Sequence, residues 1–200
     1  MRIGLDFDNT IVSYDDVFHK VALEKGLIPE YLAVNKIAVR DHLRTNGQED
    51  LWTEMQGYVY GARMQDVEPF VGAIDAIRTA KSKGYELFIV SHKTKHPFKG
   101  PKYDLHDAAR EWISKFLIHE GVHLIDPINV NFRETKEEKV DRITELSCDY
   151  FVDDLPEILL RDNFPPSTKP ILFDPQNHHN SDNKLSKVSS WHQLNEMWNR

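Results

Sequence analysis

Short apolar runs alternate along this chain with longer segments in which apolar residues recur every three or four positions. The short runs are rich in β-branched and aromatic residues, which is typical of buried β-strands. They are residues 3–7, 86–90, 122–125 with a continuation to 130, 150–152 and 171–173. We therefore predict five short strands, all of them buried.

Three of the longer segments have the periodicity of amphipathic helices: residues 70–83, residues 104–120 and a segment that begins at Thr135. Gly84 and Gly121 follow the first two segments, and glycine is the usual residue just beyond a helix C-terminus. In the third segment, Thr135 and Glu138 have the spacing of a capping box, in which each side chain binds the other residue's backbone N–H. These signals predict two helix ends and one helix start.

Strands that alternate with helices predict a parallel sheet covered by helices on both faces, which is a Rossmann-like α/β fold. In such sheets, ligands bind beyond the carboxyl ends of the strands. Residues 15–66 interrupt the alternation, because they contain only helical patterns and are too long for a simple crossover. We predict an α/β core made of residues 1–13 and 67–200, with a small helical cap inserted as residues 14–66.

Composition narrows the class of protein. A chain of 200 residues suits one domain, or one domain with a small insert. The formal net charge of −7 provides no overall positive field, so no nucleic acid is expected as a partner. Cys148 is the only cysteine, which excludes an internal disulfide and fits a reducing compartment. Without an apolar run of membrane-spanning or signal-peptide type, we expect a cytoplasmic protein that does not bind membranes.

Two carboxylates, Asp6 and Asp8, follow the first predicted strand. Their i, i+2 spacing places both side chains on the same side of an extended backbone. Two carboxylates so close together repel each other unless a cation or a reacting group offsets the repulsion. The pair therefore indicates a divalent metal ion or acid–base chemistry. The alternative is that both acids merely end the strand and that Thr10 caps the following turn.

Polar residues are placed in the same way at other strand ends. Ser91 ends the second predicted strand, and Asp153 and Asp154 follow the fourth. Lys136 and Lys139 lie in the first turn of the third predicted helix. Each residue alone has an ordinary interpretation as a turn residue, a helix cap or a surface lysine. Their coincidence at one edge of the predicted sheet indicates a common site.

These residues, in this order, resemble the motif set of the haloacid dehalogenase-like (HAD) superfamily. The motifs are Asp6-Phe7-Asp8-Asn9-Thr10, then Ser91, then a lysine, then Asp153-Asp154, each after a short apolar strand. The resemblance covers residues 1–13 and about 67–175, and the predicted cap lies where C1 helical caps of the family lie. The acid at Asp8 resembles the phosphatase and phosphotransferase branches, since the dehalogenases usually lack it.

The resemblance implies phosphoryl transfer through an aspartyl-phosphate. Asp6 would be the nucleophile, and Asp8 would act first as general acid and then as general base. It also implies Mg²⁺ as the cofactor. The implied ligands are the Asp6 carboxylate, the Asp8 backbone carbonyl and the Asp153 carboxylate, with Asp154 in a supporting position.

The transferring phosphoryl group would be bound by Ser91 and by a lysine. Lys139 is the expected lysine, and Lys136, one turn earlier, is the alternative. The residues expected to bind phosphate or substrate are Asn9, Thr10, Ser91, His92, Lys93 and Lys136. The stretch 92–102 is locally basic and contains Gly and Pro, so we expect a loop that recognises an anionic or polyhydroxylated substrate together with the cap; a solvated basic loop is the alternative.

These expectations describe a Mg²⁺-dependent phosphomonoester hydrolase that acts on a small phosphorylated metabolite, such as a nucleotide or a sugar phosphate. Two alternatives stay open. A phosphatase acting on nucleic-acid ends is disfavoured by the negative net charge, and a catalytically silent binding or regulatory module is disfavoured by the complete motif set. The sequence specifies neither the substrate nor the oligomeric state, and a homo-oligomer is compatible with it.

Overall fold

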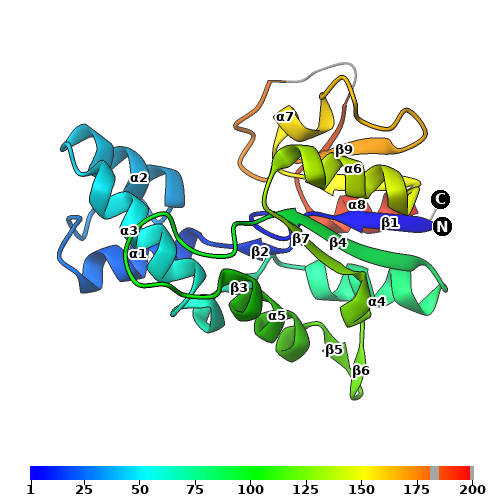
Figure 1. Ribbon diagram of the computed structural model, residues 1–200, viewed down its shortest axis with the longest axis horizontal. Helices are drawn as coiled ribbons and strands as arrows, with labels where there is room; N and C mark the ends of the chain where they lie inside the picture. Colours follow the sequence, from blue (N-terminus) through cyan, green and yellow to red (C-terminus); the bar gives the residue numbers. More distant parts are fainter. Residues whose placement is uncertain (181–184, 199–200) are drawn as a thin grey trace. The chain divides into compact units, whose positions relative to one another are not determined.

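The computed structural model describes residues 1–180 and 185–198, which form two compact units (Figure 1). The first, here named the α/β unit, is drawn from Met1–Val12, Pro69–Lys93 and Ser114–Arg200. The second, here named the helical unit, comprises Ser13–Glu68 and Thr94–Ile113. The helical unit contains residues 14–66, which we predicted to be a cap, and also residues 94–113, which we assigned to the core; the cap assignment stays a prediction.

A six-stranded parallel sheet forms the centre of the α/β unit. Its strands are β1 (Arg2–Leu5), β4 (Glu86–His92), β7 (Val130–Arg133), β8 (Tyr150–Asp153), β9 (Lys169–Phe173) and β10 (Ser186–Val188). The spatial order β10-β9-β8-β1-β4-β7 is the 3-2-1-4-5-6 order of Rossmann-like folds, so the predicted fold class is confirmed. The strand order reverses at β1, between β4 and β8, which is where ligands bind in such sheets.

Helices cover both faces of this sheet (Figure 1). On one face, α6 (Lys136–Leu146) and α7 (Pro156–Leu159) pack over a cluster that includes Phe88, Phe151 and Leu172. Side chains alternate between the faces of a strand, so Phe173, the residue after Leu172, lies on the other face. The centre of its ring is 6.2 Å from that of Trp191. That face carries α4 (Ala73–Ser82) and α8 (Trp191–Trp198).

The third predicted strand is wrong in position. Residues 122–123 form β6 (Val122–His123), which pairs antiparallel with β5 (Ile118–His119) in a separate hairpin, and the sheet strand is β7. Glu120 and Gly121 have φ of 49° and 78°, the two left-handed positions of a two-residue hairpin turn. The helix predicted for residues 104–120 therefore ends at Phe116, and Gly121 turns a hairpin instead of ending a helix.

Two local signals are confirmed. Gly84 has φ of 75°, and its N–H binds the Lys81 carbonyl at 2.9 Å, which ends α4 as expected. The capping box at the start of α6 is present, with both of its side-chain to backbone hydrogen bonds between Thr135 and Glu138.

The helical unit contains α1 (Asp15–Glu24), α2 (Lys36–Thr45), α3 (Glu49–Tyr60) and most of α5 (Leu105–Phe116). It also contains the 3₁₀ turn Met64–Asp66, whereas β2 (Val12–Ser13) and β3 (Glu68–Pro69) span the boundary between the units and the 3₁₀ turn Pro127–Asn129 belongs to the α/β unit. Aromatic rings fill the centre of the helical unit. The ring centres of Phe18 and Trp52 are 4.9 Å apart, and so are those of Tyr14 and Tyr60. Among the described residues, none of the helices has both the length and the hydropathy needed to span a bilayer.

Candidate active site

Asp6 is the first residue beyond β1, and the sheet itself holds it in place. Its N–H donates a hydrogen bond to the Val152 carbonyl at 2.8 Å, which extends the β1–β8 ladder by one residue. The residue is only 3% exposed. The sheet therefore holds a carboxylate in a buried position at the point where the strand order reverses.

A tight turn follows Asp6 and contains Asn9 and Thr10. The Ile11 N–H binds the Phe7 carbonyl at 3.1 Å, and Asn9 adopts a φ of 57°. Asparagine is one of the few residues besides glycine that tolerate this left-handed conformation, so Asn9 has a backbone role here. Thr10 is fully buried, and its Oγ1 has no hydrogen-bond partner among the described residues.

Asp8 lies in the same turn, with its carboxylate paired to a lysine. Lys93 Nζ is 2.9 Å from Asp8 Oδ2, and Lys93 is 4% exposed. From sequence we expected Lys93 to bind phosphate or substrate, whereas the structure places its ammonium on Asp8. Sequence reasoning missed this pairing, although a signal was present: Lys93 follows Ser91 by two positions, which puts both side chains on the same side of an extended segment.

Lys139 reaches the carboxylates from the first turns of α6. Its Nζ donates a hydrogen bond to Asp6 Oδ1 at 2.6 Å and forms an ion pair with Asp153 Oδ2 at 2.6 Å. All three side chains are at most 5% exposed. Lys136 instead pairs with Glu157 at 2.5 Å on the surface. Of the two alternative lysines, the structure brings Lys139 to Asp6 and leaves Lys136 away from it.

Burial controls the charge state of this cluster. The pKa of Asp6 is raised from 3.8 to about 7, chiefly because the carboxyl group is buried. The charges of Asp153 and Asp8 add to the rise, and Lys139 opposes it. Burial alone would lower the pKa of Lys139, but Asp153 and Asp6 outweigh it, so the pKa is raised and the ammonium stays charged.

Three carboxylates converge where a metal ion could be held. Oxygen atoms of Asp6, Asp153 and Asp154 lie within 4.8 Å of one another. When all three are ionised, the Lys139 ammonium offsets one of their charges and leaves an excess of two among these groups. Mg²⁺ prefers oxygen ligands, and a divalent cation matches this excess. The Asp8 carboxylate is outside this group of three; the family resemblance implies its backbone carbonyl as the ligand.

Ser91 lies at the same edge of the sheet with an unused hydroxyl group. It is 1% exposed, and its Oγ has no hydrogen-bond partner among the described residues. The register pairs Leu5 of β1 with Ile89 of β4, so Ser91 lies two residues further towards the carboxyl edge. A buried hydroxyl without a partner costs about 1–3 kcal/mol. The Ser91 hydroxyl is therefore available to a polar ligand at this edge of the sheet.

The other expected substrate-binding groups are engaged elsewhere. His92 Nε2 lies 3.1 Å from the Glu134 carbonyl, and burial lowers the pKa of His92, which keeps the ring neutral near pH 7. In the basic loop, Lys95 pairs with Asp104 at 3.6 Å. Lys99 pairs with Asp50, so two of the loop's positive charges are already matched within the helical unit.

No family model matches the chain. Two curated proteins are similar over nearly their full lengths, and both carry the name "Putative nucleotidase". The one from Oceanobacillus iheyensis is 19% identical over 201 residues, with 96% of each chain covered. The one from Bacillus cereus is 19% identical over 206 residues, with 98% of this chain and 97% of the relative covered.

Solved structures of HAD-family proteins share the fold. A HAD-family hydrolase from Deinococcus radiodurans with bound phosphate and sodium has a TM-score of 0.58 at 11% identity, over 96% of this chain and 92% of that one. A HAD-hydrolase from Bacillus subtilis bound to magnesium has a TM-score of 0.53 at 13% identity, over 100% and 98%. An L-2-haloacid dehalogenase has a TM-score of 0.57 at 12% identity, over 100% of this chain and 98% of that one. The fold alone therefore does not distinguish phosphate ester hydrolysis from dehalogenation.

Proposed function

We propose that this chain, whose fold is that of the HAD-superfamily hydrolases, is a Mg²⁺-dependent phosphomonoester hydrolase acting on a small phosphorylated metabolite. One observation carries the proposal: the ends of β1, β4 and β8 and the first turns of α6 bring Asp6, Ser91, Asp153 and Lys139 to one edge of the sheet. Asp8 favours phosphate chemistry over dehalogenation, because a leaving alkoxide takes up a proton from a general acid, whereas a halide leaves without one.

In the proposed reaction, an Asp6 oxygen attacks phosphorus and displaces the alcohol, so one P–O bond forms as another breaks. Asp8 gives its proton to the departing oxygen. A water molecule then attacks the aspartyl-phosphate, Asp8 takes up the water's proton, and inorganic phosphate leaves with Asp6 regenerated. The Lys139 ammonium and the Ser91 hydroxyl stabilise the charge on the transferring oxygens.

The metal would be held by the carboxylates of Asp6, Asp153 and Asp154 and by the Asp8 carbonyl. When bound, Mg²⁺ supplies positive charge that favours the ionised Asp6 and offsets the charge of the phosphoryl oxygens. The raised pKa of Asp6 supports this assignment, because a nucleophilic carboxylate at that position needs a further cation to be fully ionised at neutral pH.

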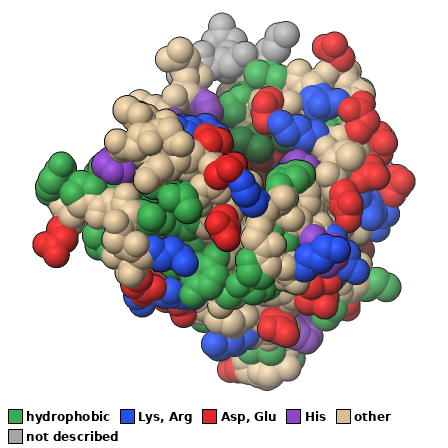
Figure 2. Space-filling view, turned by 60° about the vertical axis from the view of Figure 1, so that its left-hand side comes forward, with side chains coloured by type: hydrophobic (Ala, Val, Ile, Leu, Met, Phe, Trp, Pro, Cys, Tyr) green, Lys and Arg blue, Asp and Glu red, His purple; other side chains and the backbone are tan. Residues whose placement is uncertain are grey.

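Among small phosphate esters, a nucleotide or a sugar phosphate is our proposed substrate class, and the nucleotidase names of the two relatives support the former. Acidic and basic side chains are interspersed over the face drawn in Figure 2, which supports a small substrate over a nucleic acid. We propose a cytoplasmic location, because Cys148 is a buried free thiol and the chain has no second cysteine for it to pair with.

Phosphate release tests this function. The native protein should hydrolyse p-nitrophenyl phosphate and members of a nucleotide and sugar-phosphate panel in Mg²⁺, and should lose activity in EDTA. Asp6→Asn should be inactive, while Asp141→Asn, which changes an exposed carboxylate on α6, should behave as the native protein. If Asp6→Asn keeps most of the activity, Asp6 is not the nucleophile. If the native protein binds phosphate but releases none from the panel, the chain is a binding module.

A further inference from the structure

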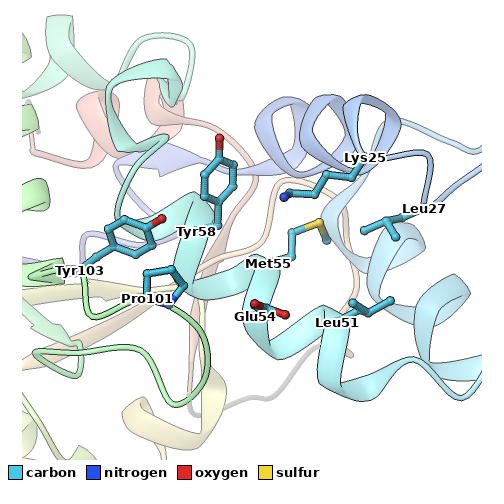
Figure 3. Close-up of a pocket in the computed structure, with 8 residues that line it drawn as sticks. All are labelled: Lys25, Leu27, Leu51, Glu54, Met55, Tyr58, Pro101 and Tyr103. Carbon is cyan, nitrogen blue, oxygen red and sulfur yellow. The ribbon is translucent and has the colours of Figure 1, made fainter.

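The helical unit contains a pocket of about 280 Å³ that the proposed active site does not use (Figure 3). Its lining comes from the end of α1, from one face of α3 and from the segment after residue 94, all of which belong to the helical unit. Met55 forms its buried floor, and Leu27, Leu51 and Pro101 add apolar surface around it. The interior therefore favours an apolar ligand surface.

Two glycines, one in α3 and one directly after it, explain why the pocket is formed in advance. A Cβ on Gly57 would lie 2.6 Å from Pro97 Cβ, and a Cβ on Gly61 would lie 2.5 Å from Tyr103 Cβ. Only glycine lets the segment 97–103 approach the helix so closely. Gly100, with φ of 87°, bends the same segment against α3. A pocket built from locked backbone needs little rearrangement to accept a ligand.

Polar groups of opposite charge border this apolar interior. Lys25 Nζ lies 4.7 Å from the centre of the Tyr58 ring, and Glu54 lies on the other side of Met55 in the close-up (Figure 3). Within the described ranges, neither Lys25 nor Glu54 forms an ion pair, and the Lys25 ammonium has only its contact with the Tyr58 ring. The pocket offers a cationic donor and an anionic acceptor among its lining residues.

We propose that this pocket binds a neutral, flat heterocycle with hydrogen-bond donors and acceptors on its edge, the chemistry of a nucleobase. Tyr103 and Met55 provide surfaces for the ring, and Tyr58 provides a further one once the Lys25 ammonium turns from it to the ligand. Lys25 attracts an anion that Glu54 repels, and the reverse holds for a cation, so the pair favours a ligand without net charge that carries both donors and acceptors. A volume near the lower end of the range for small-molecule sites fits one base or nucleoside. This inference does not depend on hydrolysis.

Binding of adenosine and cytidine, measured by calorimetry, tests the proposal on the native protein and on Asp6→Asn. Both proteins should bind at least one nucleoside saturably and with equal affinity, which separates this site from the proposed catalytic function. Tyr58→Leu should weaken binding about tenfold or more, because it removes a stacking surface. Glu54→Gln should weaken binding about tenfold, because it removes a charged acceptor. Leu51→Trp, at a position 38% exposed, should block the pocket.

Matched controls change the same residue types outside the pocket. Tyr31→Leu, at a residue 89% exposed, and Glu30→Gln should bind as the native protein does. Absence of saturable binding would overturn the proposal, as would unchanged affinity in Tyr58→Leu, Glu54→Gln and Leu51→Trp. Equal affinity for benzyl alcohol would overturn the polar part of it, since that ring lacks the donors and acceptors of a base.

Discussion

The buried carboxyl group of Asp6 should make the metal-free protein less stable as pH rises from about 4 to about 7. Its pKa is about 7 in the folded protein against an ordinary value of 3.8, because burial penalises the charged form. Between these values the folded protein holds a proton that the unfolded chain has released. Raising the pH therefore favours the unfolded chain, and the stabilisation present below pH 4 is gone above pH 7.

The size of the effect follows from the two pKa values. Each pH unit between them is equivalent to 1.36 kcal/mol, so the full contribution is about 4 kcal/mol, of which about 3 kcal/mol falls between pH 5 and pH 8. This is a substantial part of the roughly 5–15 kcal/mol by which a folded domain is stable. Mg²⁺ should reverse the trend at high pH, because it binds the ionised carboxylate and so stabilises the folded protein.

Urea unfolding in EDTA at pH 5, 6, 7 and 8 measures this, with Asp6→Asn as the reference because asparagine does not titrate. The stability of the native protein relative to the variant should fall by about 3 kcal/mol over this range. Groups whose pKa is lowered, such as Glu24 and Asp174, are present in both proteins and cancel. A flat difference would refute the pKa argument. A falling difference that Mg²⁺ leaves unchanged would refute the metal assignment alone.

Three further predictions concern single side chains. Lys139→Met should lower the free energy of unfolding, measured in urea, by about 3–5 kcal/mol and abolish phosphatase activity, because it leaves buried carboxylates without their cation. Lys136→Met, which removes only a surface pair, should lower it by less than about 1 kcal/mol, and equal losses would contradict the assignment of Lys139. Lys93→Met should slow hydrolysis of alkyl phosphates more than that of p-nitrophenyl phosphate, whose leaving group needs no proton; equal slowing would mean that Lys93 does not position Asp8. Gly61→Ala should lower stability by about 1–3 kcal/mol through the clash with Tyr103, and a native melting temperature would show that the segment 97–103 gives way.

The strands and their carboxyl-end residues could be predicted because the signals are local. A buried parallel strand is a continuous apolar run, and the residue after it must lie at the sheet edge. That rule was enough to expect Asp6, Ser91 and Asp153 at one edge. The choice of Lys139 over Lys136 rested on helix periodicity, and the structure now gives it a contact with Asp6.

Other features depend on contacts between distant residues, which periodicity does not reveal. An apolar run at 122–125 has the composition of a sheet strand, and only the left-handed turn at Glu120 and Gly121 pairs its first residues into a hairpin. The pocket of the helical unit likewise needs Tyr103 to meet Gly61, forty-two positions earlier in the chain. Nothing in either segment alone indicates the other.

The β5–β6 hairpin is a suitable place to attach a label or to immobilise the protein. It is a short ribbon separate from the six-stranded sheet, and the two residues at its tip are exposed (Figure 1). A peptide tag or a fluorophore grafted between Glu120 and Gly121 would interrupt none of the ladders that hold Asp6 in place. Immobilisation through that tip would leave the carboxyl edge of the sheet free for ligand and metal titrations.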